Sequence, residues 1–373
     1  MRRGLIGLLL SLALLCGCGG GAAAPAGDAQ AEKSAETMPL QYARQFSVEY
    51  DGSGGALITV GGTDRFYLPA ENESAAAPEG AVRLSRPAEK VYLAASSAMD
   101  LFLQLDALGA VGFTSTTAGN WALPEVRAAM EAGEMAYAGK YSAPDFELLL
   151  SSGCNLAVES TMIYHSPEVK EQLEALGIPV LVERSSYEPH PLGRVEWIKL
   201  YGLLLGKAAE AEAFFDAQVR LLSALENRSA EKPRAAFFHL STAGAAVVRK
   251  PGDFVSRMIE LAGGEFVFSE LPGSDDNALS TMNMQLEAFY AGAKDADVLI
   301  YNSAIAGELE TLDQLLAKSE LFSDFKAVRE GNVWCAEQSL FQKSSAAAGM
   351  IRDFHAVFTG TAEDDLTFLH RLK

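Results

Sequence analysis

The chain has 373 residues, of which 49% are hydrophobic, and a formal net charge of −19. This length is typical of about two domains, and the apolar content is high enough for each to bury a core. The acidic balance argues against nucleic acid as a partner and against attraction to anionic lipid headgroups.

The first residues have the pattern of a secretory leader. Arg2 and Arg3 form a basic start, and the apolar run 5–15 is too short to span a bilayer. The run ends in Leu15-Cys16-Gly17-Cys18, which resembles the lipobox of bacterial lipoproteins. The alternative is an ordinary leader whose cysteines are incidental.

The lipobox resemblance implies a lipid on Cys18, because the small Gly17 precedes it, and removal of residues 1–17 as a signal peptide. Lipid on Cys18 would anchor the protein to the cell membrane on its extracytoplasmic side without spanning the bilayer. Residues 18–45 are rich in Gly, Ala, Glu and Ser, which predicts a flexible tether between the lipid and a folded body.

The other two cysteines, Cys154 and Cys335, each border or lie in an apolar run, and they fall in different halves of the chain. We expect two buried free thiols. The five histidines are scattered without metal-ligand spacing, so the sequence predicts neither a protein-bound metal nor a cofactor.

The body begins with residues 46–68, which alternate in part between apolar and polar around Asp51-Gly52-Ser53-Gly54-Gly55 and predict a small β-hairpin. Apolar runs separated by helical segments follow, and this order predicts parallel sheets covered on both faces. Strands are expected at 91–95, 111–113, 155–159 and 179–182 in an N-terminal lobe of residues 46–193, and at 235–240, 298–301 and 333–335 in a C-terminal lobe of residues 229–373.

Residues 194–228 between the lobes repeat apolar side chains every three or four positions, as at Trp197, Tyr201 and Leu204. That period predicts a connecting helix with one buried stripe, in which Gly206 ends a first segment. The predicted fold class is therefore α/β: two Rossmann-like lobes with parallel sheets, joined by one long backbone helix and preceded by a small β-hairpin.

The lipobox, tether, paired lobes and central helix resemble the substrate-binding lipoproteins of ABC importers. The chain is most similar to the helical-backbone class that serves iron–siderophore, haem and vitamin B12 uptake. This resemblance rests on residues 91–100, 139–147, 173–180 and 188–194. It implies a monomer, not an enzyme, that binds a small-molecule metal chelate between its lobes and delivers it to a permease and its ATPase.

Two glutamates match the docking positions of this family. The resemblance implies that Glu147 in the first lobe and Glu287 in the second pair with arginines of the permease. Exposed carboxylates suit that task, since they steer association and define register. The alternative is a surface glutamate in the first turn of each helix, where it interacts favourably with the helix dipole.

Ligands of open parallel sheets bind beyond the carboxyl ends of the strands. Tyr141 also resembles a ligand-stacking aromatic of vitamin B12-binding relatives. The resemblance to haem-binding relatives implies that Met162 or His239 reaches an iron or cobalt axially. Each candidate has a packing role as its alternative. The predicted ligand-binding residues are Ser97, Trp121, Tyr141, Met162, Tyr187, Arg194, His239, Asn302, Gln338 and Phe341.

Enzyme signatures argue against the main rival class. The sequence contains neither a Gly-x-Gly-x-x-Gly run after a strand nor a Walker A motif, and it lacks the Gly-x-Ser-x-Gly nucleophile elbow. Two alternatives stay open: a lipoprotein that senses ligand without a permease, and a two-lobed chelatase, which a lipid anchor would not suit.

Overall fold

The structure is a computed structural model that describes residues 36–71, 73–225, 232–271, 281–363 and 366–373. These residues belong to one unit, Ala35–Lys373. The predicted signal peptide, Cys18 and most of the predicted tether lie outside the described residues.

A small sheet comes first in the described chain. It has five strands in the order β1-β2-β3-β4-β5, antiparallel except for the parallel pair β4 and β5. The predicted hairpin is thus only part of a larger sheet, because strands on either side extend it. The strands are β1 (Glu36–Thr37), β2 (Phe46–Tyr50), β3 (Ala56–Val60), β4 (Asp64–Leu68) and β5 (Val82–Arg83).

The N-terminal lobe has a parallel sheet in the order β12-β11-β6-β7-β8, as the apolar runs predicted. Its strands are β6 (Val91–Leu93), β7 (Val111–Thr114), β8 (Ala136–Tyr137), β11 (Ala157–Ser160) and β12 (Val180–Glu183). Neighbouring residues of β6 face different cores, since Leu93 packs in the main cluster and Tyr92 in a second one. This is the pattern of a sheet buried on both faces.

Short helices join these strands. A two-stranded hairpin of β9 (Gly139–Lys140) and β10 (Ala143–Pro144) leads into α3. The α-helices are α1 (Ser96–Gln104), α2 (Pro124–Glu131), α3 (Phe146–Ser151) and α4 (Pro167–Ala175), and the 3₁₀ turns are η1 (Leu108–Ala110), η2 (Ala118–Asn120), η3 (Thr161–His165) and η4 (Ser185–Tyr187).

The C-terminal lobe has a mixed sheet in the order β16-β14-β13-β17-β18-β19, with β15 also paired to β13. The central strands β13, β17 and β18 are parallel as predicted. The edges are not, because β14, β16 and β19 run antiparallel to their neighbours. The strands are β13 (Arg234–Leu240), β14 (Ala246–Arg249), β15 (Glu265–Phe266), β16 (Thr281–Met284), β17 (Val298–Asn302), β18 (Val333–Ala336) and β19 (Leu369–Arg371).

Side-chain caps define several helix starts in this lobe. Asp253 accepts the Val255 N–H at the start of α7, and Thr311 forms a capping box with Gln314 at α10. The helices are α7 (Phe254–Leu261), α8 (Leu286–Ala293), α9 (Ser303–Ala306), α10 (Leu312–Leu316), α11 (Lys326–Arg329) and α12 (Ala347–Phe358), with 3₁₀ turns η5 (Glu320–Asp324), η6 (Gln338–Phe341) and η7 (Ser344–Ala346).

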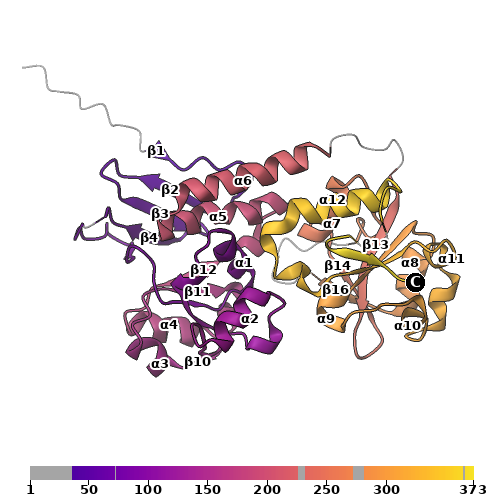
Figure 1. Ribbon diagram of the computed structural model, residues 1–373, viewed down its shortest axis with the longest axis horizontal. Coiled ribbons are helices and arrows are strands. Elements are labelled where there is room, and N and C mark those ends of the chain that lie inside the picture. The colour runs from indigo at the N-terminus through magenta and orange to yellow at the C-terminus, as the bar shows by residue number, and fades with distance from the viewer. Residues whose placement is uncertain (1–35, 72, 226–231, 272–280, 364–365) are drawn as a thin grey trace, which may run out of the picture. The chain divides into compact units, whose positions relative to one another are not determined.

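The connection between the lobes is a pair of helices, α5 (Pro191–Leu205) and α6 (Ala208–Ser223), and the prediction of one long helix is wrong. Gly206 ends α5 in the left-handed conformation, with φ 70°, and the chain turns back. The helices then pack side by side (Figure 1), so closely that a Cβ at Gly202 would lie 2.5 Å from the Ala211 Cβ.

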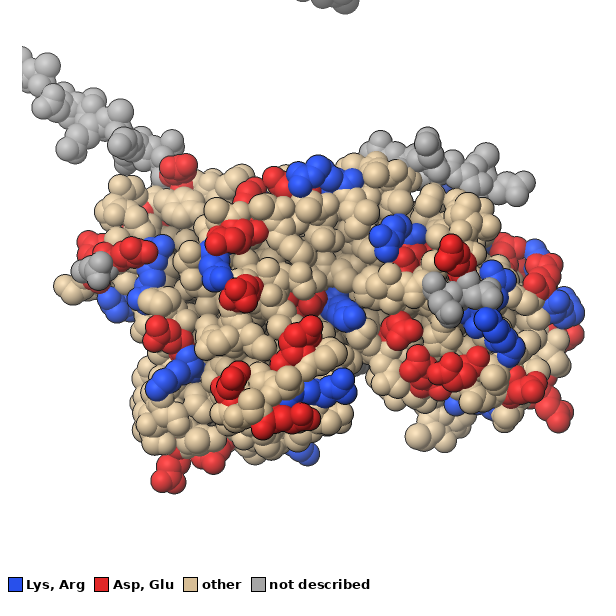
Figure 2. All heavy atoms as spheres, in the orientation of Figure 1, with Lys and Arg blue, Asp and Glu red and all other residues tan. Residues whose placement is uncertain are grey.

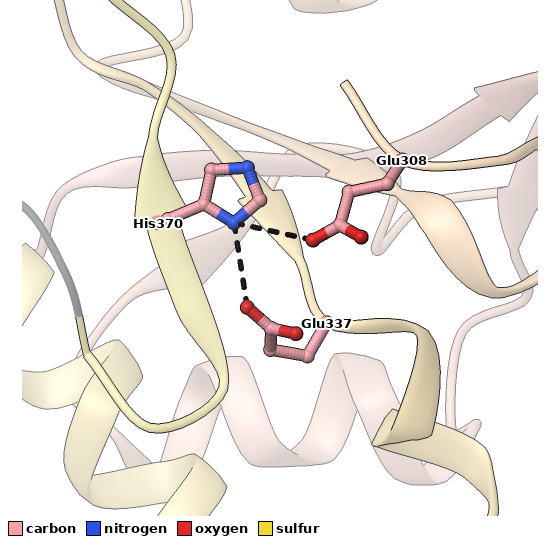
Figure 3. A group of neighbouring side chains, drawn as sticks. All are labelled: Glu308, Glu337 and His370. Atoms are coloured by element: carbon pink, nitrogen blue, oxygen red, sulfur yellow. Dashed lines mark hydrogen bonds and ion pairs between the residues drawn. The ribbon is translucent and has the colours of Figure 1, made fainter. Parts of the chain in front are cut away.

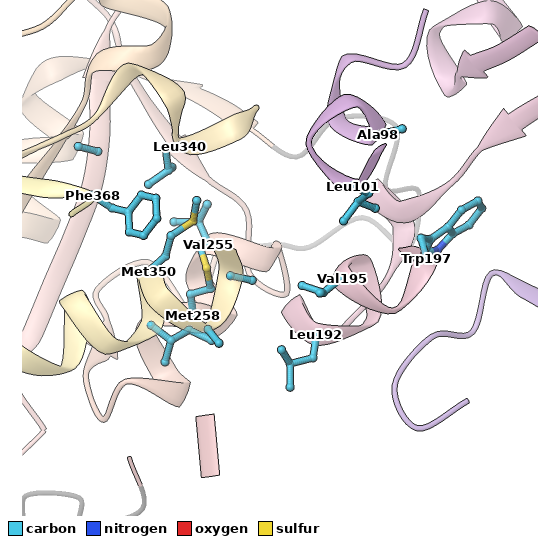
Figure 4. Packing of buried hydrophobic residues seen from close by; sticks show 14 of the residues in the cluster. Ala98, Leu101, Leu192, Val195, Trp197, Val255, Met258, Leu340, Met350 and Phe368 are labelled. Carbon is cyan, nitrogen blue, oxygen red and sulfur yellow. The ribbon is translucent and has the colours of Figure 1, made fainter. Parts of the chain in front are cut away.

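Helix α5 is central to the fold. Every residue from Pro191 to Leu204 is buried, so the helix has no solvent face, contrary to the single buried stripe that its sequence predicted. Leu192 and Val195 belong to the same hydrophobic cluster as Met258 of α7 (Figure 4). The lobes therefore share one continuous core.

Two buried glutamates tie the segment between β1 and β2 to α5. The Glu196 carboxylate accepts hydrogen bonds from the backbone N–H groups of residues 41, 42 and 43. The shortest N···O distance of each N–H group is 2.8 Å. Glu188 accepts those of Arg44 and Gln45 at 2.7 and 3.0 Å, together with the Trp197 indole N–H. Residues 36–45 are therefore part of the folded body, which corrects the predicted end of the tether.

Candidate functional site

A hollow indents the lower edge of the molecule between the two lobes in Figure 2. In the same view, α2 of the N-terminal lobe and α9 of the C-terminal lobe lie at its borders (Figure 1). Helix α9 directly follows the carboxyl end of β17. The hollow is thus bordered where the sheet topology predicts a ligand site.

At the contact between the lobes, two buried arginines stack on two phenylalanine rings. The Arg194 guanidinium of α5 lies 4.0 Å from the centre of the Phe254 ring. The Arg249 guanidinium of β14 lies 4.5 Å from the centre of the Phe341 ring. Burial lowers the pKa of both arginines, but an arginine stays charged in proteins. The cluster places two desolvated cations among aromatic faces.

Acidic side chains partly neutralise this cluster. Asp253 lies 3.7 Å from Arg249, and burial raises the pKa of its carboxyl while Arg249 opposes that rise. His239, at the end of β13, is buried, and burial together with Arg249 lowers its pKa. His239 is therefore neutral at pH 7.

Two pockets adjoin the contact between the lobes. The first is lined by Arg194, Phe254 and Phe341, but its volume of about 10 Å³ is that of a water-sized gap. The second, of about 730 Å³, lies between α1, α2, α6 and α12. That volume falls in the range of small-molecule sites, yet none of the predicted ligand-binding residues lines it.

Four predicted ligand-binding residues of the N-terminal lobe lie in helices, turns or loops that follow the carboxyl ends of its strands. Met162 is 47% exposed, whereas Tyr141 is half-buried against the second core cluster. Ser97 donates a hydrogen bond to Glu183 at 3.2 Å, and the Tyr187 ring lies 4.8 Å from the Arg184 guanidinium.

Two predicted ligand-binding residues are buried. Trp121 is 1% exposed and belongs to the main core, so its ring is not presented to a ligand. Asn302 is 2% exposed, and its side chain accepts the Ala304 N–H at the start of α9.

On the C-terminal side, Gln338 is exposed and Phe341 is half-buried beside Arg249. Arg249 and Phe254 are not among the predicted ligand-binding residues. The run Arg249-Lys250-Pro251-Gly252-Asp253 held a sign of them, because an arginine at the end of an apolar strand is followed at once by a turn and a helix cap.

Exposed apolar side chains add to this surface. Tyr164 follows β11 and is 47% exposed, and Ile305 in α9 is 65% exposed. Together with Met162 they give the strand-end loops of both lobes an apolar character, which is typical of ligand-binding surfaces.

The two predicted docking glutamates are exposed, each in the first turn of its helix. Glu147 lies in α3, whose start is capped by Asp145, and Leu150 on the same helix is 50% exposed. Glu287 lies in α8. Among the described residues no helix has the length and apolarity needed to cross a membrane.

The cysteine prediction is confirmed, since Cys154 and Cys335 are both free and buried. One group of potential metal ligands was not predicted. Within the described residues, Glu308, Glu337 and His370 bring their ligand atoms within 4.8 Å of one another. They are far apart in sequence, so no ligand spacing reveals them.

The sequence is similar to those of known lipoproteins. An uncharacterized lipoprotein of Methanocaldococcus jannaschii is 28% identical over 216 residues, which are 55% of this chain and 53% of that protein. The chain thus spans about half the length of the curated relatives it matches.

Two solved structures from Vibrio cholerae share the fold. The periplasmic haem-binding protein HutB aligns with a TM-score of 0.57 at 18% identity, over 70% of this chain and 96% of its own. The vitamin B12-binding protein BtuF aligns with a TM-score of 0.52 at 12% identity, over 74% of this chain and 98% of its own.

The sequence profile of periplasmic binding proteins matches residues 91–339, which include both lobes and the helices between them. This match confirms the resemblance to substrate-binding proteins and the expectation that the protein is not an enzyme. The chain belongs to the periplasmic binding protein family, whose members bind substrates outside the cytoplasm.

Proposed function

We propose that this protein is the substrate-binding lipoprotein of an ABC importer, which captures a haem, cobalamin or iron–siderophore ligand between its lobes. The observation that carries the proposal is the pair of arginines, Arg194 and Arg249, stacked on Phe254 and Phe341 at the contact between the lobes. Family membership and the fold shared with haem- and vitamin B12-binding proteins support it.

The chemistry of these side chains fits a large, flat and anionic ligand. A guanidinium binds a carboxylate through two parallel hydrogen bonds, and aromatic and apolar side chains cover a macrocycle or chelate face. The net charge of −19 would repel an anion at long range, so the two arginines supply the local attraction. Met162, Tyr164 and Ile305 supply exposed apolar surface on the facing loops.

Delivery requires contact with a permease. We propose that Glu147 and Glu287 make this contact, one from each lobe, as the family resemblance implies. Their exposure and their equivalent positions in the first turns of α3 and α8 support the assignment. Lipid on Cys18 would keep the body close to the permease in the membrane.

A ligand titration tests the ligand class. Purified protein is mixed in turn with haem, cobalamin and a ferric siderophore, and the absorbance spectrum is recorded. We expect saturable binding of one of the three, weakened at least ~10-fold in Arg194→Met through loss of a charged hydrogen bond. Arg257→Met is the matched control, because Arg257 is exposed on α7 and pairs with Glu260. If none of the three binds, the proposed ligand class is wrong.

A further inference from the structure

Three side chains from separate segments converge at one edge of the C-terminal sheet (Figure 3). His370 lies in β19, Glu337 directly follows β18, and Glu308 follows α9. The His370 Nδ1 atom lies 3.4 Å from the nearer oxygen of Glu337 and 3.7 Å from that of Glu308. One imidazole nitrogen thus faces two carboxylates.

The other ring nitrogen determines which tautomer is present. His370 Nε2 lies 2.7 Å from the Leu309 carbonyl oxygen, which can only accept a hydrogen bond. Nε2 therefore carries the proton, and neutral His370 presents the Nδ1 lone pair to the carboxylates. Such an arrangement is repulsive unless a cation lies among the three groups, and that cation is either a proton or a metal ion.

The distances favour the metal ion. A charge-assisted N–H···O hydrogen bond is about 2.7–2.9 Å long, shorter than the two contacts of His370. Two ligand atoms bound tetrahedrally at about 2.0 Å from a zinc ion lie about 3.3 Å apart, close to the two His370 contacts, and the two carboxylates lie within 4.8 Å of each other. Hydrogen bonding of the distal ring nitrogen to a carbonyl is also the usual support of a metal-binding histidine.

The backbone holds the three segments in place. His370 pairs with Cys335 across β18 and β19. The Glu337 N–H donates to the Phe368 carbonyl at 3.0 Å, and the Leu312 N–H donates to the Lys373 carbonyl at 2.9 Å. The strand β19 and the residue after β18 that carry His370 and Glu337 are therefore in place before any ion binds, which lowers the cost of binding.

We propose that Glu308, Glu337 and His370 form a binding site for one divalent transition-metal ion, with Zn²⁺ as the favoured ion. Imidazole and carboxylate ligands suit zinc, and three protein ligands leave one position for water. The metal site lies within the C-terminal lobe and is distinct from the proposed ligand site between the lobes. The ion would brace β19 against the loop that continues into η6, which carries Gln338 and Phe341.

Cobalt titration of metal-free protein tests the site. Protein stripped with EDTA is titrated with Co²⁺, and visible absorbance reports both stoichiometry and a tetrahedral environment. We expect one ion per chain. Loss of a group that hydrogen-bonds to a metal ligand costs ~10- to 100-fold in metal affinity. His370→Gln removes a ligand itself, so it should weaken Co²⁺ binding by more than that.

The matched control is His355→Gln. His355 is also half-buried in the C-terminal lobe, and its Nδ1 lies 2.9 Å from a backbone carbonyl. We expect this variant to bind Co²⁺ as the wild type does. Co²⁺ should raise the melting temperature of the wild type and of His355→Gln but leave His370→Gln unchanged, since only bound metal stabilises the folded state.

Two results would overturn the proposal. One is the absence of Co²⁺ uptake by stripped wild-type protein, which would identify the group as a protonated histidine between two carboxylates. The other is uptake that persists undiminished in both His370→Gln and Glu337→Gln. Haem, cobalamin and siderophore binding are measured on the same variants, so failure of the metal site is distinguished from failure of ligand capture.

Discussion

The side chain of Gln342 in the C-terminal lobe hydrogen-bonds to the backbone of Ala122 in the N-terminal lobe. Its carbonyl oxygen accepts the Ala122 N–H at 2.7 Å, and its amide donates to the Asn120 carbonyl at 3.0 Å. Nearby, buried Asp100 of α1 accepts the Ser345 N–H at 2.9 Å. These bridges, together with the shared core along α5, hold the lobes against each other.

We expect Gln342→Ala to loosen this contact. Each lost hydrogen bond removes about 0.5–1.5 kcal/mol of the closing free energy. The radius of gyration of ligand-free protein, measured by X-ray scattering, should increase, and bound ligand should dissociate faster. Gln285→Ala, at an exposed position that makes no side-chain cap to α8, is the control. Unchanged scattering and unchanged dissociation would show that the bridge does not limit opening.

Charge reversal tests the docking glutamates. We expect Glu147→Arg with Glu287→Arg to lower ligand uptake by cells at least ~10-fold, because like charges at an interface cost several kcal/mol. Ligand affinity of the purified protein should not change. Glu131→Arg with Glu210→Arg is the control, since both residues are exposed on other helices. Full uptake by the docking variant, with ligand affinity unchanged, would show that these glutamates do not dock onto a permease.

The pH dependence of stability should depend on Glu159 of β11. This side chain is fully buried, and among the described residues neither carboxylate oxygen has a hydrogen-bond partner. Burial raises the pKa of the carboxyl from 4.5 to about 8. The group is therefore protonated in the folded protein, and ionised in the unfolded chain, between those two values.

Because the folded state binds the extra proton, the contribution of Glu159 is fully present below pH 4.5 and is lost as pH rises towards 8. The loss is at most about 1.4 kcal/mol per pH unit. Urea unfolding of wild type and Glu159→Gln at pH 5 and pH 8 measures it, with exposed Glu168→Gln as control. We expect the variant to gain stability relative to wild type at pH 8, and an equal difference at both pH values would contradict the assignment.

Glu196 should be critical for the attachment of the N-terminal segment. Glu196→Gln replaces one acceptor oxygen by an N–H donor that faces backbone N–H groups, and it leaves buried Lys199 with a weaker partner. We expect a loss of about 3 kcal/mol in unfolding free energy, as for other broken buried charge pairs. Hydrogen exchange of residues 36–50 should accelerate.

The matched control for this change is Glu212→Gln. Glu212 also pairs with Lys199, at 3.2 Å, but its side chain is 47% exposed. Exposed ion pairs contribute about 0–1 kcal/mol, so little change is expected. If both variants lose the same stability, the buried hydrogen bonds of Glu196 are not what holds the segment.

Local patterns predicted the α/β class and the central strands. The apolar runs around Val91, Val111, Val180 and Val298 all became buried strands, because a strand covered on both faces needs apolar residues at every position. Gly206 likewise ended a helix, as a residue free to adopt positive φ does.

The sequence by itself determined the α/β class, the central strands and the end of α5 at Gly206, since these depend on residues within a few positions of one another. Tertiary structure alone decided what each buried face contacts: α6 beside α5, antiparallel strands at the sheet edges, and Trp121 in the main core. It also brought His370 to Glu308 and Glu337. Contacts between distant residues leave no local period, because their geometry exists only once the chain has closed on itself.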